Sequence, residues 1–418
     1  MIKKSKVILL AAVLVLAFAQ VAFSALSAVG PTNPGNGFPL WVRSSTGQNA
    51  TIAVPAGPDS IPDAGPPWVS PFAEQIGFNS EAMFWHSAAS IDPLPGPAGG
   101  GRALLALAVE AAFAAGDAVN GDQIAFARIR VRIDTDIPGT YIVTHPYGSK
   151  TYEVAPADVG TRAINDTADV GIGAPGDFSG LLLAAIDPFL VQAGFEADPN
   201  RFGDSATPAT VTGSPNNNNF FRIEGPAGFG IVETTEFVTG GQKFAGTPFT
   251  PGRATYTKDA VNGAFAEIFA TIPLPITPGT ALLARVRPAA GVRMTQSGTG
   301  FFARFPFAGN VPSDAVITGR TRGVNVTNLS VPVVDLVSIT KAQYVVGTQT
   351  LTIAAISSDS VGPLTLTAFG WPGATPAGQP LNAGGADTVF AGVPISPPTV
   401  EVKSSMGGTA TLPVTVLP

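Results

Sequence analysis

Apolar and polar residues alternate with a period of two along much of this chain. The clearest case is the segment 125–133, in which every second residue is apolar and the positions between include Arg128, Arg130 and Arg132. Side chains alternate across a strand, so this spacing predicts one apolar face and one arginine face. Turn residues follow at 136–139 and 146–148, each leading into a short β-prone run. Two hairpins so close together predict an antiparallel sheet.

Two further segments contain residues that favour a helix. The run 102–115 is rich in Ala and Leu, which favours helix, but its larger apolar residues alternate, which favours a strand. We predict a strand, because the strand that follows it needs a partner. Residues 177–185 predict one short helix that begins at Asp177 or Ser179 and ends before Pro188.

The last part of the chain has the most regular pattern. Alternating runs occur at 350–355 and 364–367, and a hairpin is expected where 399–403 and 409–416 flank the turn 404–408. Short strands at this spacing are typical of an immunoglobulin-like (Ig-like) or fibronectin-like sandwich. The Pro- and Gly-rich segment 245–252 predicts a domain boundary. The block between this boundary and the last part of the chain also carries short β-runs.

The expected fold is therefore all-β. It comprises a large N-terminal β-sandwich region at 25–245, an Ig-like sandwich at 246–334 and a C-terminal Ig-like sandwich at 335–418. Residues 25–100 read as short strands and ordered loops packed on the larger body, since they combine many Pro and Gly residues with isolated aromatics.

The amino-acid composition excludes several classes of protein. Charged residues are only 12% of the 418 residues, about half the usual share, while hydrophobic residues reach 45%. A disordered chain would be more charged and less apolar, and a coiled coil would hold far fewer than 39 prolines. The chain has no cysteine, which excludes disulfides and thiolate metal sites.

The first 24 residues read as a secretory signal peptide. Lys3, Lys4 and Lys6 precede an apolar run at 7–19, and small residues at 22 and 24 predict cleavage before Ala25. An uncleaved N-terminal anchor is the alternative. Cleavage would leave 20 basic and 29 acidic residues, a net charge of −9, and no transmembrane segment. The predicted location is secreted, extracellular or at the cell surface.

A resemblance points the same way. The stretch 121–132 with 144–148, and the stretch 335–344, resemble uncharacterised exported bacterial proteins with tandem Ig-like β-sandwich modules. The resemblance implies a tandem β-sandwich protein of the cell exterior. It implies no catalytic residue.

Catalytic chemistry has little support. The only histidines, His86 and His145, lack zinc-ligand spacing, and the chain contains no nucleophile elbow or phosphate-binding loop. A turn role for His145 and a packing role for His86 are expected. Glutamates in or near predicted strands could form the carboxylate pair of a glycoside hydrolase; they are Glu110, Glu224, Glu233, Glu236 and Glu267. We expect no catalytic residue and no enzyme activity.

Calcium is the one cofactor for which the sequence offers candidate ligands. Three groups of Asp and Asn could supply oxygen ligands from loops. They are Asp117, Asn120 and Asp122; Asn165, Asp166 and Asp169; and Asp198, Asn200 and Asp204. The same residue types dominate ordinary turns by bonding their own backbone, and we favour that reading, so no metal site is assigned.

Two sets of residues are candidates for ligand binding. The row Arg128, Arg130 and Arg132 could bind an acidic glycan or a phosphate, although pairing with acidic residues across the strands is favoured. Tryptophans could form a stacking platform for a glycan if they are exposed; the candidates are Trp41, Trp68, Trp85 and Trp371. Nucleic acid is disfavoured by the acidic balance of the chain.

The leading functional hypothesis is a non-catalytic secreted or cell-surface protein with a structural or adhesive role. Its partners would be extracellular proteins, glycans or copies of itself, because weakly charged strand surfaces suit self-association. A carbohydrate-binding protein is the first alternative, and a β-sandwich glycoside hydrolase is the second.

Overall fold

The computed structural model describes residues 25–53, 65–96, 100–322, 324 and 326–418. The predicted signal peptide lies outside these residues. Strands make up 49% of the chain and helices 4%, which confirms the all-β class. Within the described part, no helix has the length and apolar character needed to span a membrane.

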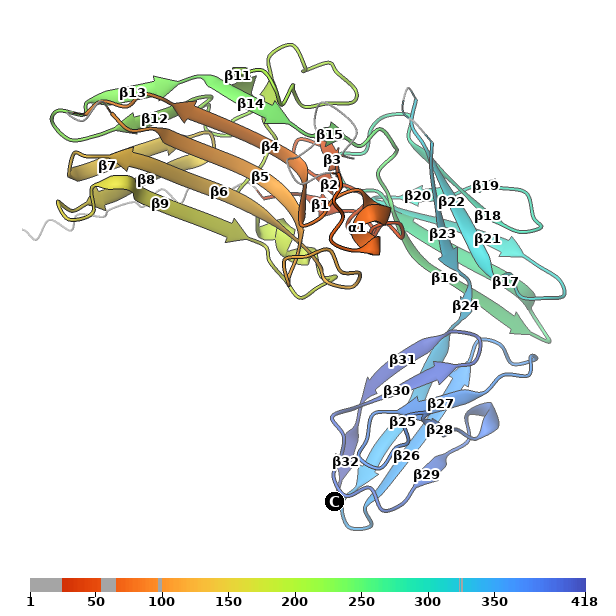
Figure 1. Cartoon of the computed structure of the whole chain (residues 1–418). Coiled ribbons are helices and arrows are strands. Elements are labelled where there is room, and N and C mark those ends of the chain that lie inside the picture. Colours follow the sequence, from red (N-terminus) through yellow and green to blue (C-terminus); the bar gives the residue numbers. More distant parts are fainter. Residues whose placement is uncertain (1–24, 54–64, 97–99, 323, 325) are drawn as a thin grey trace, which may run out of the picture.

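Three hydrophobic cores follow one another along the chain, one in each of the ranges 25–245, 246–334 and 335–418. We refer to these ranges as the N-terminal, middle and C-terminal regions. Figure 1 shows them in chain order, with the C-terminal region beside the lower end of the middle one. The exact domain boundaries stay predictions, since strand β24 (Val334–Asp335) straddles the second boundary and pairs in parallel with β16 (Thr250–Asp259) of the middle region.

The N-terminal region is built on a seven-stranded sheet with the order β10-β11-β14-β4-β5-β6-β9. Its strands are β10 (Val191–Gln192), β11 (Ala209–Thr212), β14 (Glu236–Gly240), β4 (Glu81–Ile91), β5 (Ala103–Phe113), β6 (Gln123–Thr135) and β9 (Gly160–Val170). A second sheet comprises β13 (Ile231–Thr234), β12 (Phe221–Glu224), β7 (Gly139–His145) and β8 (Gly148–Val154). A small sheet comprises β1 (Ala28–Val29), β2 (Val42–Arg43), β3 (Asn49–Thr51) and β15 (Gln242–Lys243).

The run 102–115 is a strand, as predicted. β5 pairs with β4 on one side and β6 on the other, and Leu105, Leu107 and Val109 are buried in the core. Pairing on both edges and burial of one face outweigh the helix propensity of its alanines, which is a weak preference.

The helices differ from expectation. The segment 177–185 forms only a short 3-10 helix, η1 (Ser179–Leu183), without a side-chain cap. A helix that the alternation did not predict, α1 (Pro71–Ile76), begins at Ser70, whose Oγ accepts a hydrogen bond from the Ala73 amide at 3.0 Å. It ends at Gly77, whose φ of 88° lies in the left-handed region that glycine adopts without strain.

The other two regions are each a pair of sheets around a core. In the middle region the sheets are β20 (Thr295–Ser297), β21 (Gly300–Pro306), β17 (Gly263–Thr271), β16 and β24, against β19 (Val292–Arg293), β18 (Ala281–Val286), β22 (Asp314–Arg320) and β23 (Thr327–Pro332). In the C-terminal region they are β29 (Thr388–Phe390), β26 (Thr350–Ser357), β25 (Val337–Val345) and β32 (Thr415–Leu417), against β28 (Gln379–Pro380), β27 (Leu366–Phe369), β30 (Thr399–Ser404) and β31 (Thr409–Pro413). A short 3-10 turn, η2 (Ala383–Gly385), completes the C-terminal region.

Hydrogen bonds join the N-terminal region to the middle one. Arg43 is only 3% exposed, and it donates hydrogen bonds from Nε to the Leu274 carbonyl at 3.2 Å and from Nη2 to the Pro275 carbonyl at 2.6 Å. Its guanidinium therefore ties the small N-terminal sheet to a loop of the middle region.

A second junction joins the middle region to the C-terminal one. The hydroxyl of Tyr256 donates to Oδ2 of Asp359 at 3.0 Å, and Oγ of Ser358 donates to the Tyr256 carbonyl at 2.6 Å. Two backbone hydrogen bonds flank these contacts, from the Lys258 amide to the Ser358 carbonyl at 2.9 Å and from the Ser360 amide to the Lys258 carbonyl at 3.0 Å. The two regions are thus connected here as well as through the peptide chain.

Candidate functional site

The arginine row lies on β6, as its alternation predicted. Arg128, Arg130 and Arg132 stand opposite Asp169, Thr167 and Asn165 of β9. On the other side of β6, the row is flanked by Ala108, Ala106 and Leu104 of β5. The residues of β5 directly opposite the row are uncharged, so an acidic partner must come from β9 or from a diagonal position on β5, such as Glu110.

Arg128 is fully engaged. Its Nε and Nη2 donate to the two carboxylate oxygens of Asp169 at 2.7 and 2.8 Å, and its Nη1 donates to Oε1 of Glu110 at 3.2 Å. The hydrogen bond to Asp169 raises the pKa of Arg128. This is the cross-strand acidic pairing that the sequence favoured, and it occupies all three nitrogens of the Arg128 guanidinium with carboxylate oxygens.

Glu110 is a buried acid beside this pair. It is 2% exposed, and although Oε2 lies 2.9 Å from Nη1 of Arg128, the hydrogen bond is made to Oε1, so Oε2 is buried without a donor. Burial raises its pKa from 4.5 to about 7; the cation of Arg128 opposes this rise, and the charges of Glu81 and Asp169 add to it. A proton-accepting group at neutral pH is present here, but its burial keeps it from a bulky external substrate.

Among the described residues, the side chains of Arg130 and Arg132 donate hydrogen bonds to neutral groups only. Nε of Arg130 donates to Oγ1 of Thr167 at 3.2 Å, and Nε of Arg132 donates to Oδ1 of Asn165 at 3.3 Å. Within the described residues, neither guanidinium has an acidic oxygen within 4.0 Å. Burial and the charges of Arg128 and Arg132 lower the pKa of Arg130.

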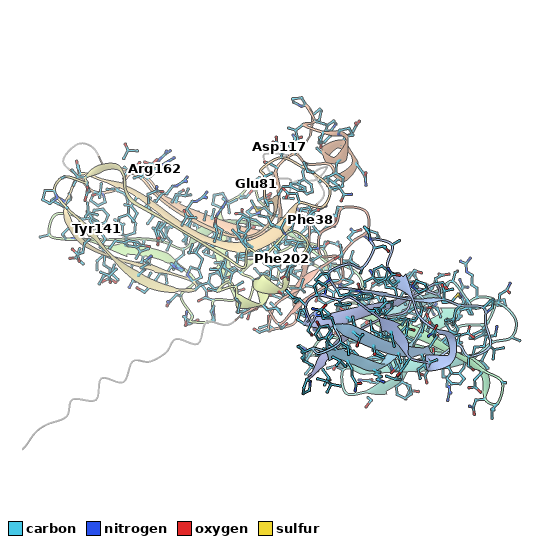
Figure 2. The ribbon with its side chains drawn as sticks, turned by 90° about the horizontal axis from the view of Figure 1, so that it is seen from below. Phe38, Glu81, Asp117, Tyr141, Arg162 and Phe202 are labelled. Carbon is cyan, nitrogen blue, oxygen red and sulfur yellow. The ribbon has the colours of Figure 1, made fainter. Side chains whose placement is uncertain are left out.

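A depression of about 290 Å³ adjoins the end of the row. Three arginines line it, Arg102, Arg132 and Arg162, together with Asp92 and Asp134. Asp134 offsets part of the positive charge, because its carboxylate lies 3.6 Å from Nε of Arg102 and accepts the backbone amide of Arg162 at 2.7 Å. Figure 2 shows Arg162 at the far end of the N-terminal region from Asp117.

Arg102 and Arg162 were not identified from the sequence. Each lies 30 positions from Arg132 along the chain, Arg102 before it and Arg162 after it, and only the pairing of the strands brings them to Arg132. The depression could hold a small anion between guanidinium groups.

Of the residues considered for calcium, three aspartates hydrogen-bond to the backbone of their own turns, whereas Asp166 and Asp169 lie on strand β9 and bind Lys150 and Arg128. Asp122 accepts the Ala115 amide at 2.7 Å, and Asp198 accepts the amides of Asn200 and Arg201 at 2.7 and 3.0 Å. Asp204 accepts the Ala206 amide at 3.0 Å. Asn120 accepts a side-chain hydrogen bond from Gln123, and Asp117 is exposed near helix α1. In the described part of the chain, no three His, Asp or Glu side chains are grouped as metal ligands.

The tryptophans are not an exposed platform, and the prediction is wrong for Trp41 and Trp85. These side chains are 1% and 0% exposed, and Trp371 is 7% exposed. Trp85 stacks on Phe189 and donates from Nε1 to the Leu190 carbonyl at 3.0 Å. Trp68 is half-buried against the N-terminal core. Phe189 and Tyr147, which are distant in the sequence, pack against the Trp85 ring, and a local pattern does not reveal such contacts.

Three of the remaining titratable candidates, His145, Glu233 and Glu267, have structural partners, whereas the buried Nδ1 of His86 has no hydrogen-bond partner among the described residues. His145 is buried in a turn, where Nδ1 accepts the Tyr147 amide at 3.2 Å, and burial lowers its pKa to about 4. Burial also lowers the pKa of His86. Glu233 pairs with Arg222, and Glu267 lies 3.8 Å from Arg304.

Comparison with known proteins gives no family. No family model matches the sequence, and no curated protein matches it. Among solved structures, the 47-kilodalton lipoprotein Tp47 of Treponema pallidum is similar at 9% identity and a TM-score of 0.19, over 66% of this chain and 86% of that one. A Ca²⁺-stabilized adhesin with which an Antarctic bacterium binds ice is similar at 11% identity and a TM-score of 0.14, over 81% and 91% of the two chains. A 1.5-MDa bacterial ice-binding adhesin is similar at 12% identity and a TM-score of 0.13, over 70% and 88%. Such low TM-scores carry no argument about function.

Proposed function

We propose that this chain is a non-catalytic protein of the cell exterior with a structural or adhesive role. The observation that carries the proposal is the serial arrangement of three β-cores whose junctions are made by side-chain and backbone hydrogen bonds. Such an arrangement holds surfaces at defined separations, which a scaffold or an adhesive protein needs.

The state of the ionisable groups supports the non-catalytic part of the proposal. Glu110 and His145 have the most displaced acid–base equilibria near neutral pH, and both side chains are buried. A general acid or base must come within hydrogen-bond reach of its substrate, so buried groups of this kind serve the fold better than a reaction.

A carbohydrate-binding role is the second candidate. The depression beside Arg132 favours it, because guanidinium groups recognise the carboxylates of acidic sugars in a bidentate manner. The burial of Trp41 and Trp85 speaks against the stacking mode of sugar recognition.

Localisation tests the proposal. The full chain would be produced with a C-terminal epitope tag in a bacterial host, and the cells fractionated and labelled with antibody without permeabilisation. A matched chain lacking residues 1–24 serves as the control for export. Label on the intact cells or in an extracellular assembly is the expected result. Retention of the full chain in the cytoplasm, or a monomer in the medium with no affinity for cells, would refute the proposal.

A further inference from the structure

The middle region is basic although the whole chain is acidic. The full sequence has a net charge of −6, whereas residues 246–334 contain eight basic and three acidic residues. The basic residues are Arg253, Lys258, Arg285, Arg287, Arg293, Arg304, Arg320 and Arg322. A local excess of one sign in a chain of the opposite sign indicates a surface for a charged partner.

Four of these arginines share one face. In the sheet β19-β18-β22-β23, Leu282, Ala284 and Val286 point into the core, so the intervening residues of β18 point outward. Arg285 is one of them. The register places Arg293 of β19 opposite Leu283, and Arg320 of β22 opposite Ala281, on this same outer face. Arg287 follows β18 directly. We name Arg285, Arg287, Arg293 and Arg320 the arginine face; all four are exposed.

The arginine face is free of internal partners. In the described part of the chain, none of its four guanidinium groups forms an ion pair or lies over an aromatic ring. On the opposite sheet of the same region the arginines are engaged: Arg253 lies over Phe269 at 4.7 Å, and Arg304 lies over Phe265 at 3.4 Å and 3.8 Å from Glu267. Exposed cations gathered without such partners keep all their donors for a ligand.

The surface between these arginines is shallow and polar. Arg285, Arg287 and Arg320 line a hollow of about 550 Å³ with Thr318 and Asn328. The single acid on this face, Asp314, accepts hydrogen bonds from the hydroxyls of Ser330 and Ser313, which lower its pKa, and the charges of Arg285 and Arg287 lower it further. Arg285, Arg287 and Arg320 therefore border one hollow, and the carboxylate of Asp314 leaves most of their charge uncompensated.

We infer that the arginine face binds an anionic polysaccharide through its carboxylate groups. The guanidinium fork matches a carboxylate in a bidentate manner, and this face uses arginine alone, with no lysine. The cations come from three different strands and span the face, which suits a polymer with repeated charges better than one small anion. Oγ1 of Thr318 donates to Oδ1 of Asn328 at 2.7 Å, which leaves the amide nitrogen of Asn328 to donate to a sugar hydroxyl.

Two other polyanions fit less well. Proteins that bind single-stranded nucleic acid stack the bases on aromatic side chains, and the strands of this sheet contain no aromatic residue. Peripheral binding to a bilayer uses apolar side chains that enter the lipid, whereas this hollow is lined mainly by charged, polar and small residues.

The test uses the chain from residue 25 onward and immobilised polygalacturonate, with fully methyl-esterified polygalacturonate as the uncharged match. We expect binding to polygalacturonate at about 50 mM salt, at least tenfold weaker binding at about 500 mM salt because exposed charges are screened, and no binding to the ester. The double variant Arg285→Gln/Arg320→Gln should bind at least tenfold more weakly, since it loses two charge-assisted contacts. The variant Arg253→Gln/Arg304→Gln removes the same charge from the opposite sheet and should bind as the parent does.

Three outcomes would overturn the inference. They are equal binding to the esterified polymer, equal loss of binding in the two double variants, and tighter binding to poly(dT) or to vesicles with anionic lipid than to polygalacturonate. If the Gln variant does not fold, Arg285→Lys/Arg320→Lys decides, because it keeps the charge and removes the fork, and it should weaken binding. The inference names a ligand class for the proposed adhesive role and rests on that role only for the place where binding occurs. Binding in vitro by a protein that is confined to the cytoplasm would refute the adhesive role but not the binding of polysaccharide by the arginine face.

Discussion

The buried carboxyl of Glu110 makes the stability of the N-terminal region depend on pH. Its pKa in the folded protein is about 7, against 4.5 for a free glutamate. The substitution Glu110→Gln keeps the shape and removes the titration. Its amide oxygen can still accept the hydrogen bond that Nη1 of Arg128 donates to Oε1 at 3.2 Å. Arg128 also keeps both bonds to Asp169.

The magnitude follows from proton linkage. A group whose pKa is raised on folding contributes stability that is complete below its unfolded pKa and is lost as the pH rises through its folded pKa. For Glu110 this interval runs from 4.5 to about 7. At about 1.4 kcal/mol per pKa unit, the free energy of unfolding should fall by about 3 kcal/mol across it.

In the parent protein, the titration of His145 offsets part of this loss in the free energy of unfolding. Burial lowers the pKa of His145 from 6.5 to about 4, so its contribution has the opposite sign: it is present above pH 6.5 and is lost as the pH falls toward 4. Between pH 4.5 and 6.5 the two effects oppose each other. The parent curve alone therefore tells little, whereas the difference between parent and Glu110→Gln isolates Glu110.

Urea unfolding from pH 4 to 8, followed by tryptophan fluorescence, measures that difference, because three of the four tryptophans lie in the N-terminal region. The free energy of unfolding of the parent minus that of the variant should fall by about 3 kcal/mol between pH 4.5 and 7, and stay level above pH 7.5. Glu236→Gln, an exposed carboxylate of the same sheet, is the matched control for loss of charge. A level difference curve for Glu110→Gln, or the same step in Glu236→Gln, would show that burial does not hold the proton on Glu110.

Three further predictions test the junctions and the cores. Tyr256→Phe leaves buried Asp359 without its hydroxyl donor and should cost about 1.5–3 kcal/mol in urea unfolding; Tyr344→Phe, which removes a bond to a neutral carbonyl, should cost about 0.5–1.5 kcal/mol, and equal losses would contradict the role of Asp359. Arg43→Lys removes the fork that holds two carbonyls of the middle region and should speed hydrogen exchange at that junction, while unchanged exchange would show the junction to be independent of it. Leu351→Ala, at a fully buried site, should cost about 2–5 kcal/mol of C-terminal stability in calorimetry and leave the N-terminal transition in place; a common shift of all transitions would contradict separate cores.

Local periodicity was enough to predict much of the fold. The alternation at 125–133 predicted β6 and the direction of its arginines, and the need for a partner strand predicted β5. Helix α1 was not predicted, because a six-residue helix among prolines has a recognisable cap but is too short to show periodicity. The burial of Trp41 and Trp85 was not predicted either, and for Trp85 the reason is that its ring packs against Phe189 and Tyr147, which are distant in the sequence.

The candidate sites were predicted only in part. Cross-strand pairing of Arg128 followed from its position on a strand, but the identity of its partner depended on the register between β6 and β9. The arginine face combines residues from β18, β19 and β22, and Arg285 and Arg320 come onto one face only through the pairing of β18 with β22. The local excess of basic residues in 246–334 is visible in the sequence, whereas the face that gathers them is a property of the sheet.

The junction between the middle and C-terminal regions has a consequence for recognition. A single peptide link would let the C-terminal region rotate, and a partner touching both regions would then have to halt that rotation when it binds. The second attachment, through Tyr256, Lys258 and the segment 358–360, forms when the chain folds and restricts that rotation before any partner binds. The loss of orientational entropy then falls on folding and not on association, so the two regions meet a common partner already aligned.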